Sequence, residues 1–198
     1  MGKAERTRQF IIEKAATIFN EKGIAGATID DVLAATKMAK GGFYGHFESK
    51  EALSYAAVDH NLNTLVEKLG AALSKHTTAK ARLFAYLDFF SNPLQSPMQG
   101  GCPMVNFGTE ADDTNPVVRQ KVKKTMEGGQ QGIRAIIESG IAAGEFKKTW
   151  NSREFAVKMF ALIEGGTMVC RVLGSNTQMR LLMEGLKKEI EEQENKSK

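Results

Sequence analysis

The chain has 198 residues, a hydrophobic content of 42%, a charged content of 25% and a net charge of +4. These values are ordinary for a globular protein, and the length allows one large domain or two smaller ones. No apolar run approaches the roughly 18 residues of a membrane-spanning helix, and the N-terminus lacks the apolar core of a secretory signal. We therefore expect a cytoplasmic protein with no membrane partner.

The N-terminal fifty residues begin with a predicted helix over residues 5–22, which Gly23 ends. Its apolar side chains lie near helical spacing: Phe10, Ile11, Ala15, Ile18 and Phe19. Thr28 is a candidate cap for the next helix, and the acids at 30 and 31 suit the positive end of that helix. A short turn from Thr36 to Met38 then leads to a short helix over residues 39–45.

The remaining chain also indicates helices, and no stretch has sustained strand alternation. Gly128, Gly129 and Gly132 interrupt one long helix, where they indicate a bend or a close helix crossing. We predict an all-α fold of about nine helices, with a domain boundary after Lys50 that gives domains over 1–50 and 51–198. The later helices are expected from residue 48 or 49 to 73, from about 77–79 to 90, and over residues 104–111, 117–143, 152–173 and 177–192.

Two helices joined by a short turn, at residues 28–45, are able to dock in a major groove of DNA if the second helix is held rigidly. The residues expected to hold it are Ile29, Val32, Leu33, Phe43 and Phe47, packed on Phe10, Ile11, Ala15 and Phe19. The residues expected to face DNA are Lys40, Gly41, Gly42, Tyr44 and His46. The first 50 residues carry eight Lys or Arg and six Asp or Glu, a net charge of only +2, so charge alone does not identify this interface.

Each candidate DNA contact has a chemical reason. Lys40 is able to neutralise a phosphate or reach a guanine edge, and Tyr44 and His46 are able to hydrogen-bond phosphate oxygens. Thr28 and Lys50 lie at helix N-termini, where backbone amides favour phosphate. The alternative for the aromatic residues is a place in the core, which we expect for Phe43 and Phe47, and the alternative for the lysines is simple solvation.

The segment KMAKGGFYGHFESKEAL resembles the recognition helix, and the start of the following helix, in the TetR family of bacterial transcriptional regulators. The resemblance covers residues 8–55, including the pattern from Phe19 to Gly23, and beyond that it reduces to helix number and length. Ala39 and Gly42 depart from the family, which often has serine or threonine at the first position and a larger base-reading side chain at the second. Both departures remove polar contacts, so readout is expected to depend more on Lys40, the backbone and DNA shape.

The resemblance implies a repressor that binds a palindromic operator as a homodimer, with half-sites about 34–36 Å apart, and that a small-molecule effector releases. It implies a DNA-binding domain over 1–50 and an effector-binding and dimerisation domain over 51–198. Candidate effector contacts are Phe84, Phe90, Met104, Phe107, Met126, Met159 and Phe160. Apolar stripes on the last two helices are candidates either for internal packing or for a four-helix dimer interface, which we favour. These stripes contain Phe155, Ile163, Gly166, Cys170, Met179, Leu182, Met183 and Leu186.

Other chemistry has weaker support. Cys102 and Cys170 lack metal-type spacing, and no ligand with suitable spacing accompanies His46, so no metal or cofactor is predicted. Nucleophilic catalysis by Cys102 would need a base, and none of the histidines has an evident role near it, so no enzyme is predicted. Two alternatives remain open: a redox-responsive regulator acting through Cys102, and a transcriptional activator.

Overall fold

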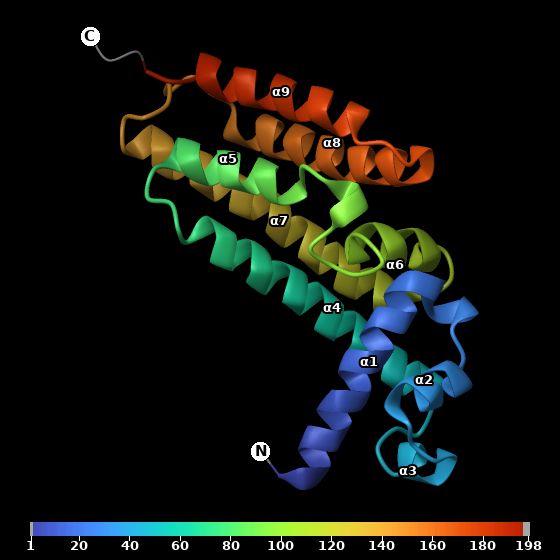
Figure 1. The fold of residues 1–198 in the computed structure, drawn as a ribbon. Coiled ribbons are helices and arrows are strands. Elements are labelled where there is room, and N and C mark those ends of the chain that lie inside the picture. Colours follow the sequence, from blue (N-terminus) through green and yellow to red (C-terminus); the bar gives the residue numbers. More distant parts are fainter. Residues whose placement is uncertain (1, 196–198) are drawn as a thin grey trace. The chain divides into compact units, whose positions relative to one another are not determined.

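The computed structural model describes residues 2–195, and in that range the chain is all-α, as predicted (Figure 1). Its one pairing of extended backbone is an isolated bridge between Phe146 and Glu194. None of the helices among these residues is long and apolar enough to cross a membrane. The helices are α1 (Lys3–Gly26), α2 (Ile29–Thr36), α3 (Lys40–Tyr44), α4 (Lys50–Leu73), α5 (Ala79–Phe90), α6 (Pro103–Ala111), α7 (Pro116–Ala142), α8 (Ser152–Leu173) and α9 (Thr177–Glu192), with a 3-10 turn at Pro93–Gln95.

Packing divides the chain into two compact units. The N-terminal unit is Met1–Val66 with Met98–Lys124, and it contains α1 to α3, α6 and parts of α4 and α7. The C-terminal unit is Glu67–Pro97 with Thr125–Lys198, and it contains α5, α8, α9 and the remainder of α4 and α7. The predicted functional division after Lys50 concerns DNA binding and effector binding, and it stays a prediction.

The N-terminal unit has an apolar core close to the predicted one. Phe19, Val32 and Phe43 are among the buried residues, whereas Ile29 and Leu33 are half-buried. Phe10 was expected in this core, and that expectation is wrong because its side chain is 41% exposed. The next two positions, both isoleucines, take the inward direction, and a helix turns about 100° per residue, so Phe10 faces outward with the Lys14 ammonium over its ring.

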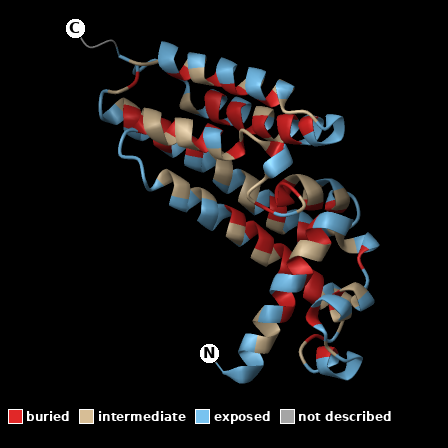
Figure 2. Cartoon of the chain, in the orientation of Figure 1, coloured by how far each residue is buried: buried red, intermediate tan, exposed pale blue. Residues whose placement is uncertain are grey.

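The C-terminal unit packs α8 against α9 and against α5. Figure 2 shows the buried residues of α8 as a run along the helix. Gly166 of α8 allows the close approach of α9, because a Cβ there would lie 2.8 Å from Leu182 Cδ1. Gly129 of α7 has a similar role, since a Cβ there would lie 2.8 Å from Phe160 Cε2. Of the three glycines predicted to interrupt this helix, Gly129 therefore marks a close helix crossing, whereas a Cβ at Gly128 or Gly132 would meet nothing within 4 Å.

Candidate nucleic-acid interface

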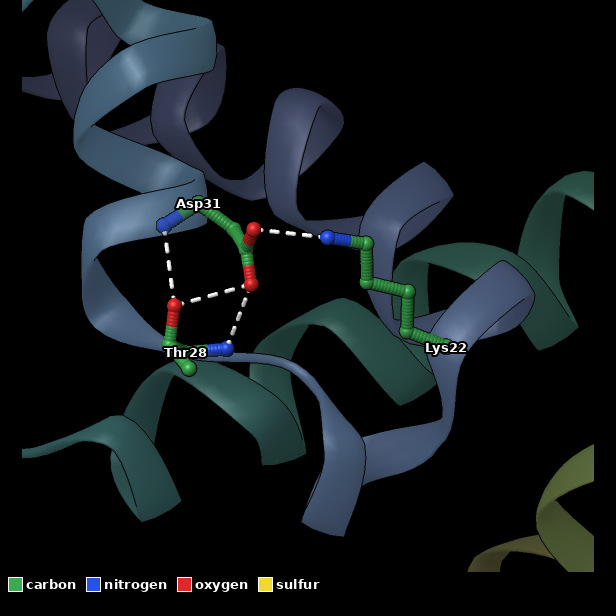
Figure 3. A network of polar contacts seen from close by, with 3 residues as sticks. All are labelled: Lys22, Thr28 and Asp31. Carbon is green, nitrogen blue, oxygen red and sulfur yellow. Dashed lines mark hydrogen bonds and ion pairs between the residues drawn. The ribbon is translucent and has the colours of Figure 1, made fainter.

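The start of α2 is fixed by a network of three side chains (Figure 3). The Asp31 backbone N–H donates to Thr28 Oγ1 at 3.1 Å, and the Thr28 backbone N–H donates to Asp31 Oδ2 at 2.8 Å, which completes a capping box. Lys22 of α1 binds the other carboxylate oxygen of Asp31 at 2.6 Å. The Lys22 ammonium and the two Thr28 donors lower the pKa of Asp31 to about 2. The predicted capping role of Thr28 is confirmed.

The turn between α2 and α3 depends on one residue with left-handed backbone. Lys37 ends α2 with a φ of 56°, and its N–H donates to the carbonyl of Leu33. Non-glycine residues adopt this conformation uncommonly, and here it reverses the chain so that α3 follows after Met38 and Ala39. Lys37 is exposed three positions before the start of α3, and it was not among the candidate contacts predicted from the sequence. Its position next to the short helix was the available signal.

The short helix α3 has a buried face and an exposed face. Phe43 and the following Phe47 are buried, with ring centroids 6.0 Å apart, and the Arg8 guanidinium covers the Phe47 ring at 4.7 Å. Both rings are buried, as expected from the sequence, and the Arg8 contact connects this segment to α1. Tyr44 is 48% exposed, and its ring meets Phe43 edge-on. The other exposed residues of this face are Lys40, Gly41 and Gly42.

The two glycines of α3 are not required by the packing of the chain itself. A Cβ at Gly41 would meet no atom within 4 Å, and one at Gly42 would make an ordinary contact 3.4 Å from Met38 Cε. Neither glycine has a positive φ. The internal structure would therefore accept alanine at either position, and any need for glycine must come from a molecule that approaches α3 from outside.

Two other predicted contacts are partly engaged within the chain. Lys50 Nζ donates to the carbonyl of Ala25 at 3.2 Å, and it is half-buried. Thr28 Oγ1 donates its hydroxyl proton to Asp31 Oδ2 at 2.8 Å, within the capping box of α2. His46 is half-buried just after α3. A phosphate contact by any of the three stays a prediction.

Helix α6 binds the end of α1 through polar side chains that sequence reasoning missed. Asn20 of α1 is 3% exposed, and its Nδ2 donates to the carbonyls of Gln99 and Gly101 at 2.6 and 3.0 Å. Asn106 Nδ2 donates to the backbone carbonyl and to Oδ1 of Asn20 at 2.9 and 3.1 Å. No local sequence signal connects residues that lie 86 positions apart.

Glu110, one turn further along α6, binds the backbone of α1 directly. Its carboxylate accepts the Ile24 N–H at 2.8 Å and the Ala25 N–H at 2.7 Å. A cavity of about 370 Å³ opens beside this contact within the N-terminal unit. The residues that line it are Ile24, Ala25, Lys50, Glu51, Ser54, Glu110, Ala111, Thr114 and Asn115.

The predicted effector contacts are divided between the two units. Met104 and Phe107 are buried in the N-terminal unit, and the other five belong to the C-terminal unit. Of those five, Phe84 and Met126 are half-buried, and the remainder are buried: Phe90, Met159 and Phe160. None of the seven lines the cavity beside Glu110. Binding of an effector by these residues stays a prediction.

The predicted dimer contacts lie mostly inside the C-terminal unit. Phe155, Ile163, Gly166 and Cys170 of α8 are buried, and so are three of the four predicted contacts of α9: Met179, Met183 and Leu186. Leu182 is half-buried. These residues pack α8 and α9 within one chain. The exposed apolar residues of the two helices form a different set, which contains Val157, Met168, Val169, Val172, Leu173 and Leu181.

Comparison with known proteins gives the same assignment for both parts of the chain. The family model "Bacterial regulatory proteins, tetR family" matches residues 11–57, and "Tetracyclin repressor-like, C-terminal domain" matches residues 79–186. A TetR transcriptional regulator from Chloroflexus aurantiacus has a TM-score of 0.92 and 36% identity, over 98% of each chain. A TetR-family regulator from Cytophaga hutchinsonii has a TM-score of 0.90 and 34% identity, over 100% of this chain and 99% of that one.

A curated relative adds a described activity. The transcriptional repressor DhaR of Mycobacterium sp. (strain GP1) is 27% identical over 141 residues, which are 71% of this chain and 70% of that protein. The matched helix-turn-helix segment contains the exposed face of α3. The chain belongs to the TetR family of bacterial transcriptional regulators. It is a regulator of transcription and not an enzyme.

Proposed function

We propose that this chain is a transcriptional repressor that acts in the cytoplasm, binds a palindromic operator as a homodimer, and is released by a small-molecule effector. The observation that carries the DNA-binding part is the exposed face of α3, where Lys40, Gly41, Gly42 and Tyr44 lie on a helix anchored by buried aromatic rings. A rigid short helix with a cation, an aromatic hydroxyl and two small residues suits close approach to a major groove.

The first test removes the polar contacts of α3. An operator is selected from random-sequence duplex DNA, and its affinity is measured at several salt concentrations. The double variant Lys40→Ala and Tyr44→Ala is expected to abolish selective binding while the dimer persists. Lys148→Ala is the matched control, because it removes one lysine from an exposed position of the C-terminal unit. If the wild-type chain selects no sequence, the repressor proposal is wrong.

The second test adds a side-chain atom at Gly41, where no other atom of the chain lies within 4 Å of the added Cβ. Gly41→Ala adds a methyl group that meets nothing in the chain, and alanine favours a helix by up to about 1 kcal/mol over glycine. The variant should therefore unfold at an equal or higher temperature than the wild type. Its operator affinity should fall, because the Cβ would occupy the space that the DNA backbone or a base edge needs. Unchanged affinity would argue against direct approach of DNA to this residue.

Dimerisation is proposed through the exposed apolar residues of α8 and α9 in place of the buried stripe. Val172 is 80% exposed and Leu181 is 64% exposed, although both are large and apolar. Met168 and Val172, four residues apart, lie on one face of α8. Such a patch is typical of a protein interface, and two half-sites require two copies of α3. Val172→Glu should give monomers by analytical ultracentrifugation, whereas Val66→Glu, an exposed change on α4, should not.

Release by an effector requires a ligand that binds two conformations with different affinity. A shift from mostly bound to mostly released operator needs a difference of about 5 kcal/mol. The apolar residues Phe84, Phe90 and Met126 of the C-terminal unit are the proposed contacts, together with Met159 and Phe160. Screening apolar compounds for loss of operator binding tests this part. If release is abolished in Met126→Ala and Phe160→Ala but kept in Met98→Ala, the assignment is supported.

A redox-responsive regulator is the second candidate, and one observation favours it. Cys102 is the residue before α6, the helix that binds α1 through Asn106 and Glu110. A thiol at a helix N-terminus lies where the partial positive charge favours thiolate. The Cys102 side chain is only 4% exposed, so oxidation would require local opening. If oxidant releases Cys102→Ser from DNA as readily as it releases the wild type, this candidate is excluded.

A further inference from the structure

The contact between α6 and α1 has a regular pattern. Asn106 and Glu110 lie four residues apart on α6, so they share one face of the helix. Their targets on α1, Asn20 and Ile24, are also four residues apart, and each pair is separated by 86 positions in the sequence. The two helices are therefore joined by two successive polar contacts, of which the second lies nearest to α2.

The second contact is at a break in α1. Gly23 has a φ of 76° and a ψ of 163°, which ends the regular helix, and residues 24–26 form a separate final turn. The first N–H groups of a new turn have no carbonyl partner within it. Glu110 supplies that partner for Ile24 and Ala25, with distances typical of charge-assisted hydrogen bonds. Its carboxylate lies so close to Gly23 that a Cβ there would be 3.0 Å from Oε2.

This final turn is also held on its other side and leads directly into α2. Lys50 of α4 binds the Ala25 carbonyl, so both backbone polar groups of Ala25 have partners from other helices. The buried Ala27 then donates its N–H to the Gly23 carbonyl, and Thr28 caps α2. The direction in which the chain leaves α1 is therefore set at residues 24–27. That direction places α2, and through the Lys37 turn it places α3.

We infer that Glu110 is a positioning residue for DNA recognition: its carboxylate holds the last turn of α1 and thereby orients α2 and α3. The inference rests on the proposed function, in which α3 reads the operator. Glu110 belongs to α6, outside the segment that contacts DNA in this proposal. It contributes to affinity only through the geometry of the final turn.

Loss of the Glu110 charge should change the affinity for DNA in the direction opposite to that expected from simple electrostatics. Glu110→Gln has nearly the same volume but keeps only one acceptor oxygen, and its NH₂ group would face a backbone N–H. Removing a negative charge should strengthen binding to phosphates if charge is all that matters. If Glu110 positions α2, the same change should weaken selective binding by about tenfold or more, the size expected for a lost charge-assisted hydrogen bond.

The experiment compares Glu110→Gln with Glu67→Gln, which removes one carboxylate from an exposed position of α4. Selective and non-selective DNA affinities are measured at a temperature where circular dichroism shows both variants fully folded. Amide hydrogen exchange is followed in the same proteins without DNA. We expect Glu110→Gln to lose selective affinity about tenfold or more, to keep its non-selective affinity, and to exchange faster at Ile24, Ala25 and over α2. Glu67→Gln should change none of the three.

Glu110→Asp keeps the charge and shortens the side chain by one CH₂, so it provides a second test if the glutamine variant does not fold. This variant should also lose selective affinity and exchange faster at Ile24, Ala25 and over α2, but both changes should be smaller. The inference is overturned if both Glu110 variants match Glu67→Gln in exchange, or if exchange accelerates while selective affinity stays unchanged. If the wild type selects no operator, the proposed function is wrong. Exchange over α2 then still decides whether Glu110 holds that helix in place.

Discussion

The interiors of the two units are stabilised by different kinds of contact. Among the described residues, the buried polar side chains of the N-terminal unit are Asn20, Thr36, Ser54 and Asn61, whereas the C-terminal unit has Thr167. The Asn61 amide, for example, binds the Ala16 carbonyl at 2.8 Å from α4 to α1. In the C-terminal unit the buried contacts between helices are mostly apolar. Its polar contacts are part-buried or lie at the surface, such as the Glu145 carboxylate, which accepts the N–H groups of Ala79 and Lys80, and the ion pair of Lys187 with Asp88.

Polar and apolar contacts differ in how strictly they fix the placement of helices. A hydrogen bond needs partners at a defined distance and angle, and a buried one costs about 1–3 kcal/mol when a partner is lost. Polar contacts therefore fix the relative placement of α1, α2 and α6, which suits a unit that presents one short helix. Apolar side chains tolerate repacking with little loss of stability, and methionines do so most readily. The C-terminal unit is built from such contacts, which suits a change of shape on binding.

The largest expected effect tests the polar contacts directly. Asn20→Leu keeps the branched shape and the number of side-chain heavy atoms but leaves the carbonyls of Gln99 and Gly101 without their donor. We expect a loss of about 4 kcal/mol in the free energy of unfolding, measured with urea. Ile137→Leu in the apolar core of the C-terminal unit is the comparison, and it should cost less than about 1.5 kcal/mol. Equal losses would show that the two cores are not different in kind.

The next effect depends on what surrounds a glycine. Gly100 has a φ of 88°, and a Cβ there would lie 2.9 Å from backbone atoms of Asn20. Gly100→Ala should destabilise the protein by about 3 kcal/mol, because neither the backbone at Gly100 nor the helix backbone at Asn20 is able to move aside. At Gly166 the nearest atoms are flexible ends of Leu182 and Met179, so Gly166→Ala should cost about 1 kcal/mol or less. Thermal unfolding of both variants measures the contrast.

A smaller change of opposite sign is expected in α7. Gly132 is exposed, and a Cβ there would meet nothing within 4 Å. Gly132→Ala should stabilise the protein by up to about 1 kcal/mol through helix propensity alone. Gly129→Ala, only three residues away, should destabilise it, because the new Cβ would press on the Phe160 ring. A gain at both positions would show that α8 moves away from α7 without cost.

The smallest effect concerns acid and the Figure 3 network. The pKa of Asp31 is lowered from 3.8 to about 2 in the folded chain, so its ionised form favours folding. That contribution is complete above pH 3.8 and is lost as the pH falls toward 2. The stability difference between wild type and Asp31→Asn should therefore shrink over this range, as measured by urea unfolding. Because the carboxylate is accessible to solvent, the change should also weaken at high salt.

Features with local causes were predicted well from the sequence. The bounds of α8 and α9 agree with those expected, and Thr28 caps α2 as expected. Capping residues, glycine stops and apolar spacing act within one or two helical turns, so the sequence carries their signal directly. The exposed face and the buried face of α3 followed from the same spacing.

Features with distant causes were not predicted. An apolar stripe on α8 or α9 must be covered, but the stripe does not say whether the same chain or a second copy covers it. The structure places most of that stripe inside the C-terminal unit and leaves Val172 and Leu181 exposed. Likewise Phe10 has the right spacing for the core, and only the packed rotation of α1 turns it outward.

The amino-acid sequence by itself determined the all-α fold, the helix-turn-helix segment and the family, because these depend on local spacing, capping and a contiguous motif. Tertiary structure alone decided how the motif is held. Asn20 and Glu110 give no local sign of their roles, since a polar residue on a helix is normally solvated. Their partners lie 79 to 86 positions away in the sequence and come within hydrogen-bonding distance only when α6 packs on α1.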